Sequence, residues 1–188
     1  MLLEKEVFYY NPDEATRRIL SANPGATLEQ ANSEAWKEGK RLLERAIEER
    51  LDFAFETTLG GNTIPALLQK AVAKGIEVRI WFAGLSSPEL HTKRVQSCVK
   101  AGGDDIPEQK IRERYNKSRT NLIDLMPGLT ELRVYDNSGE TDPKRGKRPE
   151  PRLMLHVDRG KIVSMGGVNS DTEWAKPILA QAMKLNRS

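Results

Sequence analysis

The stretch Ile76-Glu-Val-Arg-Ile-Trp-Phe-Ala-Gly-Leu85 is the clearest guide to the fold of this chain. Apolar side chains alternate along it at three positions: Val78, Ile80 and Phe82. Such alternation predicts a half-buried β-strand. Helical patterns over residues 62–74 and 87–101 lie on either side of it. A strand between two helices is typical of an α/β unit in which neighbouring strands run parallel.

The same alternation extends over the rest of the chain. Further strands are predicted at 7–10, 51–57, 129–135, 152–157 and 161–165, and further helices at 15–20, 27–50, from Pro107 onward, and 172–185. The last two strands are expected to form a hairpin around Asp158-Arg-Gly160. We therefore predict one α/β domain over residues 1–188, with a mainly parallel sheet flanked by helices and a C-terminal β-hairpin and helix.

Composition favours a soluble globular protein. Of the 188 residues, 38% are hydrophobic and 30% are charged. No apolar run reaches the length of a membrane span, and the first six residues lack the apolar core of a secretory signal. Cys98 is the single cysteine, so no internal disulfide can form, and we expect it to be a small core residue. These features favour a cytoplasmic protein with no membrane partner.

The net charge of +3 owes much to one basic segment, Lys144-Arg-Gly-Lys-Arg148. A basic loop can contact nucleic acid, but no aromatic residues alternate with these cations, so a solvated loop is favoured over a nucleic-acid partner. His91 and His156 are far apart and have no partners at the spacing of metal ligands. The sequence therefore predicts no histidine-based metal site.

The helix expected from Pro107 has two cationic faces. Asp105 is positioned to cap it, and a buried stripe is expected at Ile111, Tyr115, Leu122, Leu125 and Met126. One charged face carries Arg112, Asn116 and Arg119, and another carries Lys110, Arg114, Lys117 and Asn121. Since one guanidinium group can donate to two phosphate oxygens at once, the helix is a candidate lid over phosphates. The alternative is an ordinary solvated helix surface.

Polar groups follow three of the predicted strands, where ligands bind in parallel α/β sheets. Asp13 follows the first strand and can act as a base toward a hydroxyl, or cap the next helix. Glu56 and Thr57 follow the second and can hydrogen-bond a hydroxylated acceptor, or simply face water. Ser86 and Ser87 follow the third. Each position allows both a functional and a structural interpretation.

Several motifs together resemble the zeta-toxin-like P-loop kinases. They are Phe53-Ala-Phe-Glu-Thr-Thr-Leu59, Asn11-Pro-Asp-Glu14, Ser86-Ser-Pro-Glu-Leu90, Gly102–Asn121 and Arg133-Val-Tyr-Asp-Asn-Ser138, in the family's order over roughly residues 7–165. Asp104 stands where the family commonly has histidine. The resemblance implies transfer of phosphate from ATP, with Mg²⁺, to a hydroxylated acceptor such as a UDP-linked amino sugar. A small antitoxin-like protein is a possible partner.

The resemblance also implies roles for particular residues. Asp13 would be the catalytic base, and Glu56 with Thr57 would bind the acceptor. Three arginines would bind phosphates: Arg94, Arg112 and Arg114.

The printed sequence contains no Walker A pattern, Gly-x-x-x-x-Gly-Lys-Ser/Thr, which cradles phosphates in P-loop kinases. We therefore expect a domain that lacks the family's first strand and phosphate loop and is impaired as a kinase. Three explanations for this missing segment compete: a start site placed too late, a natural degenerate copy, or a remodelled fold that closes the gap. The alternative function is a non-catalytic module that binds a nucleotide sugar or a protein partner.

Overall fold

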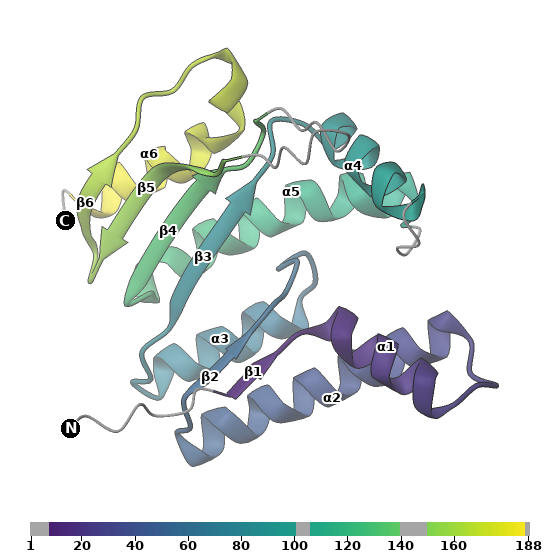
Figure 1. Cartoon of the computed structure of the whole chain (residues 1–188). Helices are drawn as coiled ribbons and strands as arrows, with labels where there is room; N and C mark the ends of the chain where they lie inside the picture. Colours follow the sequence, from purple (N-terminus) through teal and green to yellow (C-terminus); the bar gives the residue numbers. More distant parts are fainter. Residues whose placement is uncertain (1–7, 101–105, 140–149, 187–188) are drawn as a thin grey trace, which may run out of the picture. The chain divides into compact units, whose positions relative to one another are not determined.

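The computed structural model describes residues 8–100, 106–139 and 150–186, which form two compact units divided after Thr58. The first unit contains two strands and two helices, and the second contains the remaining elements (Figure 1). Expectations for Asp104, Asp105 and the basic segment 144–148 lie outside the described residues.

The first unit consists of β1 (Phe8–Tyr10), α1 (Pro12–Ala22), α2 (Leu28–Glu49) and β2 (Phe53–Phe55). The two strands are parallel, with Tyr10 opposite Phe55. Tyr10 is buried with Ala15 and Ala35, and its hydroxyl donates to the Ala35 carbonyl oxygen at 2.5 Å. A side chain at Gly39 would lie 2.6 Å from the Tyr10 ring, so glycine allows α2 to pack closely against β1. Tyr10 thus joins the strand to the long helix.

Local sequence signals set the helix ends in this unit. The capping box expected at Thr27 is confirmed, since the Gln30 amide donates to Thr27 Oγ1 and the Gln30 side chain accepts from the Thr27 amide. At α1 the cap is Asn11, whose Oδ1 accepts from the amides of Asp13 and Glu14. The interpretation of Asp13 as the cap was therefore wrong by two positions.

The second unit begins after Thr58 and is larger. Its helices are α3 (Thr63–Ala73), α4 (Pro88–Lys100), α5 (Glu108–Leu125) and α6 (Lys176–Leu185), with short 3₁₀ segments η1 (Met126–Gly128) and η3 (Ser170–Ala175). Its strands are β3 (Arg79–Gly84), β4 (Glu131–Asp136), β5 (Arg152–Asp158) and β6 (Lys161–Met165).

The predicted arrangement of the sheet is wrong. Among the described residues, hydrogen bonds form a two-stranded parallel sheet, β1-β2, and a separate four-stranded sheet in the order β3-β4-β5-β6. Only β3 and β4 are parallel in the larger sheet, because β5 and β6 each run antiparallel to the strand before them. The fold is therefore mixed α/β with two sheets. A strand–helix alternation predicts parallel neighbours but does not specify which strands share one sheet.

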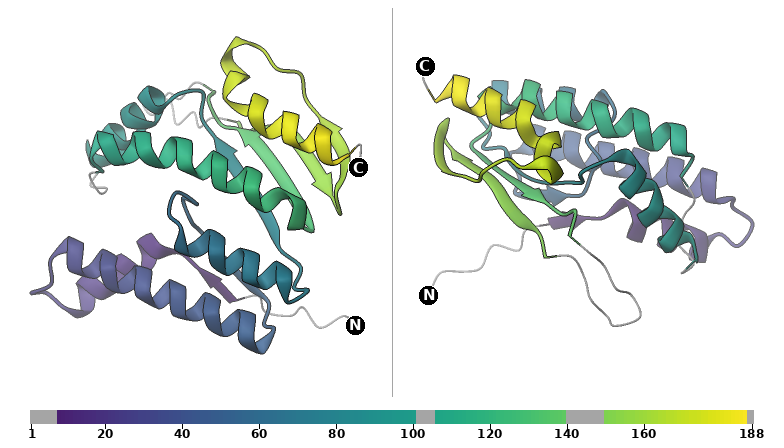
Figure 2. Two further views of the ribbon diagram at one scale, coloured as in Figure 1. Left: turned by 180° about the vertical axis from the view of Figure 1, so that it is seen from behind. Right: turned by 90° about the horizontal axis from the view of Figure 1, so that it is seen from above.

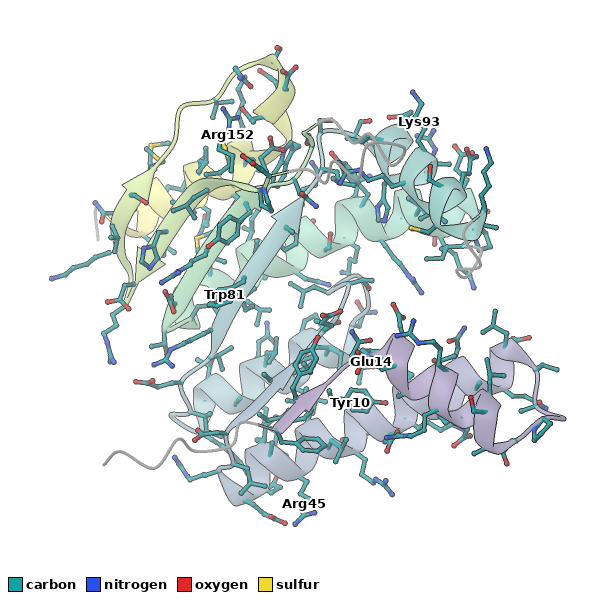
Figure 3. The ribbon with its side chains drawn as sticks, viewed as in Figure 1. Tyr10, Glu14, Arg45, Trp81, Lys93 and Arg152 are labelled. Carbon is teal, nitrogen blue, oxygen red and sulfur yellow. The ribbon has the colours of Figure 1, made fainter. Side chains whose placement is uncertain are left out.

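One face of the larger sheet packs on helices. Views from behind and from above show α5 and α6 on the same face (Figure 2). The predicted stripe of α5 is buried at Ile111, Leu122, Leu125 and Met126, whereas Tyr115 is half-buried. Trp81, labelled in Figure 3, belongs to the opposite face, since its neighbour Phe82 contacts Trp174. The Trp81 side chain is 72% exposed, with the Arg133 guanidinium 5.6 Å from its ring.

The structure also tests the expectations for membrane spans and for Cys98. Within the described residues, no helix has both the length and the apolar character needed to cross a membrane. Cys98 is exposed on α4, so its expected place in the core is wrong. None of the side chains of α4 is fully buried, because this helix packs against α5 along a narrow contact.

Gly84 gives a test of the packing between β3 and η3. A methyl group there would lie 2.1–2.7 Å from the Trp174 indole, so we expect Gly84→Ala to destabilise the protein by about 1–3 kcal/mol. Gly167→Ala is the matched control, because no atom lies within 4 Å of its added methyl group. Urea unfolding measures both, and equal midpoints for the two variants would show that the indole does not pack against Gly84.

Candidate functional site

The first candidate site lies at the carboxyl end of β1 and β2. Because the strands are parallel and Tyr10 is opposite Phe55, the segments that follow them leave at the same edge. The Glu56 amide donates to the Tyr10 carbonyl oxygen at 3.1 Å and extends this pairing by one residue. Asn11 and Glu56 are therefore neighbours. Asp13 follows in the first turn of α1.

The Glu56 carboxylate is held by two donors. The Tyr9 hydroxyl donates to Oε1, and Asn11 Nδ2 donates to Oε2 at 3.1 Å. Asn11 Nδ2 also lies 3.5 Å from the Tyr9 hydroxyl. These hydrogen bonds lie at the surface, where Tyr9 and Glu56 are exposed. The result is an oriented carboxylate that remains open to a ligand.

Asp13 is exposed in the first turn of α1, where the helix dipole favours a negative charge. Its carboxylate makes no hydrogen bond or ion pair with any other described residue. It is therefore available as a hydrogen-bond or proton acceptor. Thr57, which follows Glu56, is also exposed. The structure thus brings Asp13 and Glu56 to one edge of the first unit.

Tyr9 and the side chain of Asn11 are functional candidates that sequence reasoning missed. A signal was present, since residues two apart in a strand point to the same face. Tyr9 and Asn11 have this spacing at the end of β1. What the sequence could not supply is the register that places Glu56 beside them.

The Tyr9–Glu56 hydrogen bond has a measurable consequence. It is the largest cause that raises the pKa of Tyr9 above its ordinary value, while the bond from Asn11 acts in the opposite direction. Because the carboxylate accepts from the neutral phenol, Tyr9 loses its proton at higher pH. We expect Glu56→Gln to lower the pKa of Tyr9 toward its ordinary value. An absorbance titration of tyrosinate, with Tyr9→Phe identifying the transition, measures this. An unchanged Tyr9 transition would show that the bond does not form in solution.

The second candidate site lies at the carboxyl end of β3 and β4 in the second unit. Gly84 is opposite Asp136, and the Asn137 amide donates to the Gly84 carbonyl oxygen at 2.9 Å. Ser138 Oγ accepts from the Ser86 amide at 2.7 Å and donates to Asp136 Oδ1 at 2.6 Å. Trp174 Nε1 donates to the same Asp136 oxygen at 3.2 Å. This network fixes the loops after both strands.

Arg94 and His91 are both on α4, and Arg94 reaches the loop that follows β4. Arg94 donates to the Gly139 carbonyl oxygen at 3.1 Å, while its Nε is buried without a partner. The other such atom among the described residues is Oδ1 of Asn137, on the neighbouring loop. Burial, followed by the charges of Arg94 and Arg114, lowers the pKa of His91. Arg94 and Arg114 are therefore both near His91, and both contribute positive potential there.

Arg112 is in a different situation. Its guanidinium pairs with Glu89 at 2.7 Å and with Glu108 at 2.8 Å. The backbone amide of Glu89, the Arg112 guanidinium and the Ser87 hydroxyl together lower the pKa of Glu89. Phosphate binding by Arg112 would require these pairs to break. Arg114 lies two residues further along α5, on another face, and packs against Gly60.

Comparison with known proteins adds little. No family model and no solved structure matches the chain. Among curated proteins it is similar to one from Haemophilus influenzae described as an uncharacterized protein, with 31% identity over 85 residues. The matched region is 45% of this chain and 61% of that protein, so the chain spans less than two thirds of the relative's length. The relative's description gives no activity, ligand or partner.

Proposed function

We propose that this chain is a zeta-toxin-like phosphotransferase domain that acts on a small hydroxylated acceptor, such as a UDP-linked amino sugar. The observation that carries the proposal is the placing of Asp13 and Glu56 at the shared carboxyl edge of β1 and β2. Phosphoryl transfer to a hydroxyl requires an acceptor for its proton and groups that orient it. A cytoplasmic location accompanies this proposal.

In this proposal the two carboxylates have different roles. Asp13 has no hydrogen-bond partner among the described residues, so it accepts the proton from the attacking hydroxyl. Glu56 is oriented by Tyr9 and Asn11 and binds a second hydroxyl of the acceptor. Thr57 adds a further hydrogen-bonding group beside it. Together they select an acceptor with more than one hydroxyl group.

Within the second unit, the sequence resemblance implies that Arg94 and Arg114 bind phosphate. The Arg94 guanidinium donates to the Gly139 carbonyl oxygen, and its planar set of N–H donors matches phosphate oxygens. Arg114 adds charge close to His91. ATP is the donor that the sequence resemblance implies. The described residues contain no cluster of three or more His, Cys, Asp or Glu side chains that could hold a metal ion, so they supply no dedicated protein site for Mg²⁺.

A second candidate function is a non-catalytic module that binds a nucleotide sugar. One specific observation favours it: none of the Gly-Lys pairs in the printed sequence belongs to a Walker A pattern. In P-loop kinases that loop supplies much of the stabilisation of the transferred phosphate. Under this proposal the Tyr9–Asn11–Glu56 cluster binds the sugar, and no phosphate is transferred. An antitoxin-like protein partner remains a proposal under either function.

Two substitutions separate the roles of the carboxylates. With ATP, Mg²⁺ and UDP-N-acetylglucosamine, we expect Asp13→Asn to lower turnover about 10²–10⁴-fold and leave sugar binding within about threefold, since general bases contribute at this level. Glu56→Gln is expected to weaken sugar binding about tenfold. The matched control is Glu14→Gln, another exposed carboxylate in the first turn of α1 (Figure 3), and it should change neither quantity.

Calorimetry and a phosphate-transfer assay give the readouts. Sugar binding without turnover in the unmodified chain would support the binding module in place of the transferase. Absence of both sugar binding and turnover would contradict both functions. An equal loss in Glu14→Gln and Asp13→Asn would show that only the charge of the helix N-terminus matters.

A further inference from the structure

A groove in the second unit lies between the loop 60–62 and one face of α5. It encloses about 700 Å³ and is open to solvent, and four charged side chains line it: Lys110, Glu113, Arg114 and Lys117. We call it the cationic groove. It has no aromatic residue in its lining. Every lining residue belongs to the second unit, so the groove is complete within that unit.

The loop side of the groove is fixed by α5 itself. The buried Asn121 side chain donates from Nδ2 to the carbonyl oxygens of Leu59 at 2.7 Å and Gly61 at 2.8 Å. A methyl group at Gly60 would lie 2.8–3.2 Å from Arg114, so only glycine lets the loop approach so closely. Leu59 is buried with φ of 53°, a conformation that is uncommon outside glycine. The backbone on the loop side of the groove is thus held in place by α5.

The cations on this face of α5 outnumber its carboxylates. Lys110, Arg114 and Lys117 follow one another at four- and three-residue spacing, which brings like charges together on a helix and destabilises it slightly. None of the three makes an ion pair or hydrogen bond with another described residue. Glu113 is the one carboxylate in the lining, and it accepts a hydrogen bond from Gln109 Nε2 at 2.9 Å. The lining therefore keeps three cations against one anion.

The other arginines of the same helix behave differently. Arg112 pairs with two carboxylates. Arg119 donates to Asn116 at 2.6 Å, and its guanidinium lies 4.2 Å from the centre of the Tyr115 ring. Both are satisfied by neighbours within the unit. The contrast locates the unpaired positive charge of α5 in the groove.

We propose that the cationic groove binds the phosphate or pyrophosphate group of a small soluble molecule. Two lysines supply mobile ammonium donors, and Arg114 supplies a planar fork that matches two phosphate oxygens. Three cations and one carboxylate leave a net charge of +2, which suits a doubly charged anion. A nucleic-acid strand is disfavoured, because the lining lacks an aromatic residue for base stacking and contains Glu113. The proposal shares Arg114 with the phosphate binding proposed above, but it requires only binding and no phosphate transfer by this chain.

The test is calorimetric binding of inorganic pyrophosphate and of UDP to the full chain. We expect Lys110→Gln combined with Lys117→Gln to raise both dissociation constants at least tenfold, and Arg114→Gln to do so about tenfold, because charge-assisted hydrogen bonds are lost. Arg112→Gln is the matched control. It removes one charge from the same helix outside the groove and should change binding less than twofold. Circular dichroism melting establishes that each variant is folded.

Each outcome decides the proposal. Binding of pyrophosphate but not UDP identifies the site as one for a free phosphate group, and binding of both identifies a nucleotide or nucleotide-sugar site. No binding of either probe, or an equal loss in Arg112→Gln, overturns the proposal. A single-stranded oligonucleotide of about twenty nucleotides is the last arm. If it binds more tightly than UDP, with a steep salt dependence, the groove is part of a nucleic-acid surface and the proposal fails.

Discussion

Parallel strands in register bring the segments that follow them to the same edge of a sheet, and both strand-end sites in this protein depend on that geometry. In the first unit the pairing of Tyr10 with Phe55 places Asn11 beside Glu56. In the second unit, the pairing of Gly84 with Asp136 brings together the loops that follow β3 and β4. The hydrogen bond from the Ser86 amide to Ser138 Oγ joins these two loops. A slip of one residue in either pair would turn every following side chain to the opposite face. The register is therefore the constraint on which the chemistry rests.

The sequence predicted the elements well because their signals are local. The capping box at Thr27 and Gln30 and the buried stripe of α5 are each specified within a few turns of helix. The hairpin of β5 and β6 is likewise present around Asp158. The division into two sheets was not predicted, since it depends on pairing between residues far apart in the chain. Exposure of Cys98 was missed for a similar reason, because helical periodicity does not show how narrow the contact of α4 is.

The candidate site shows the same limit at the level of single side chains. The sequence places Arg112 and Arg114 on different faces of one helix, and this is what the structure has. It does not show that Glu89 and Glu108 neutralise Arg112 while Arg114 faces a groove with few anions. Glu89 comes from α4, and only tertiary packing brings it to α5. Charge pattern thus locates cations, whereas packing decides which of them remain available to a ligand.

Asn11 shows why one residue type fits its position in the first unit. Its Oδ1 accepts from the amides of Asp13 and Glu14 and caps α1, while its Nδ2 donates to Glu56. Aspartate and serine are also good caps, but neither supplies the amide donor, and aspartate would add a second carboxylate beside Glu56. Together with Tyr9, this donor restricts a glutamate side chain whose free rotation is worth about 1.5–2 kcal/mol of entropy. This side-chain entropy is lost when the chain folds and not when a ligand binds. A ligand therefore contacts a carboxylate that is already oriented at the end of β2.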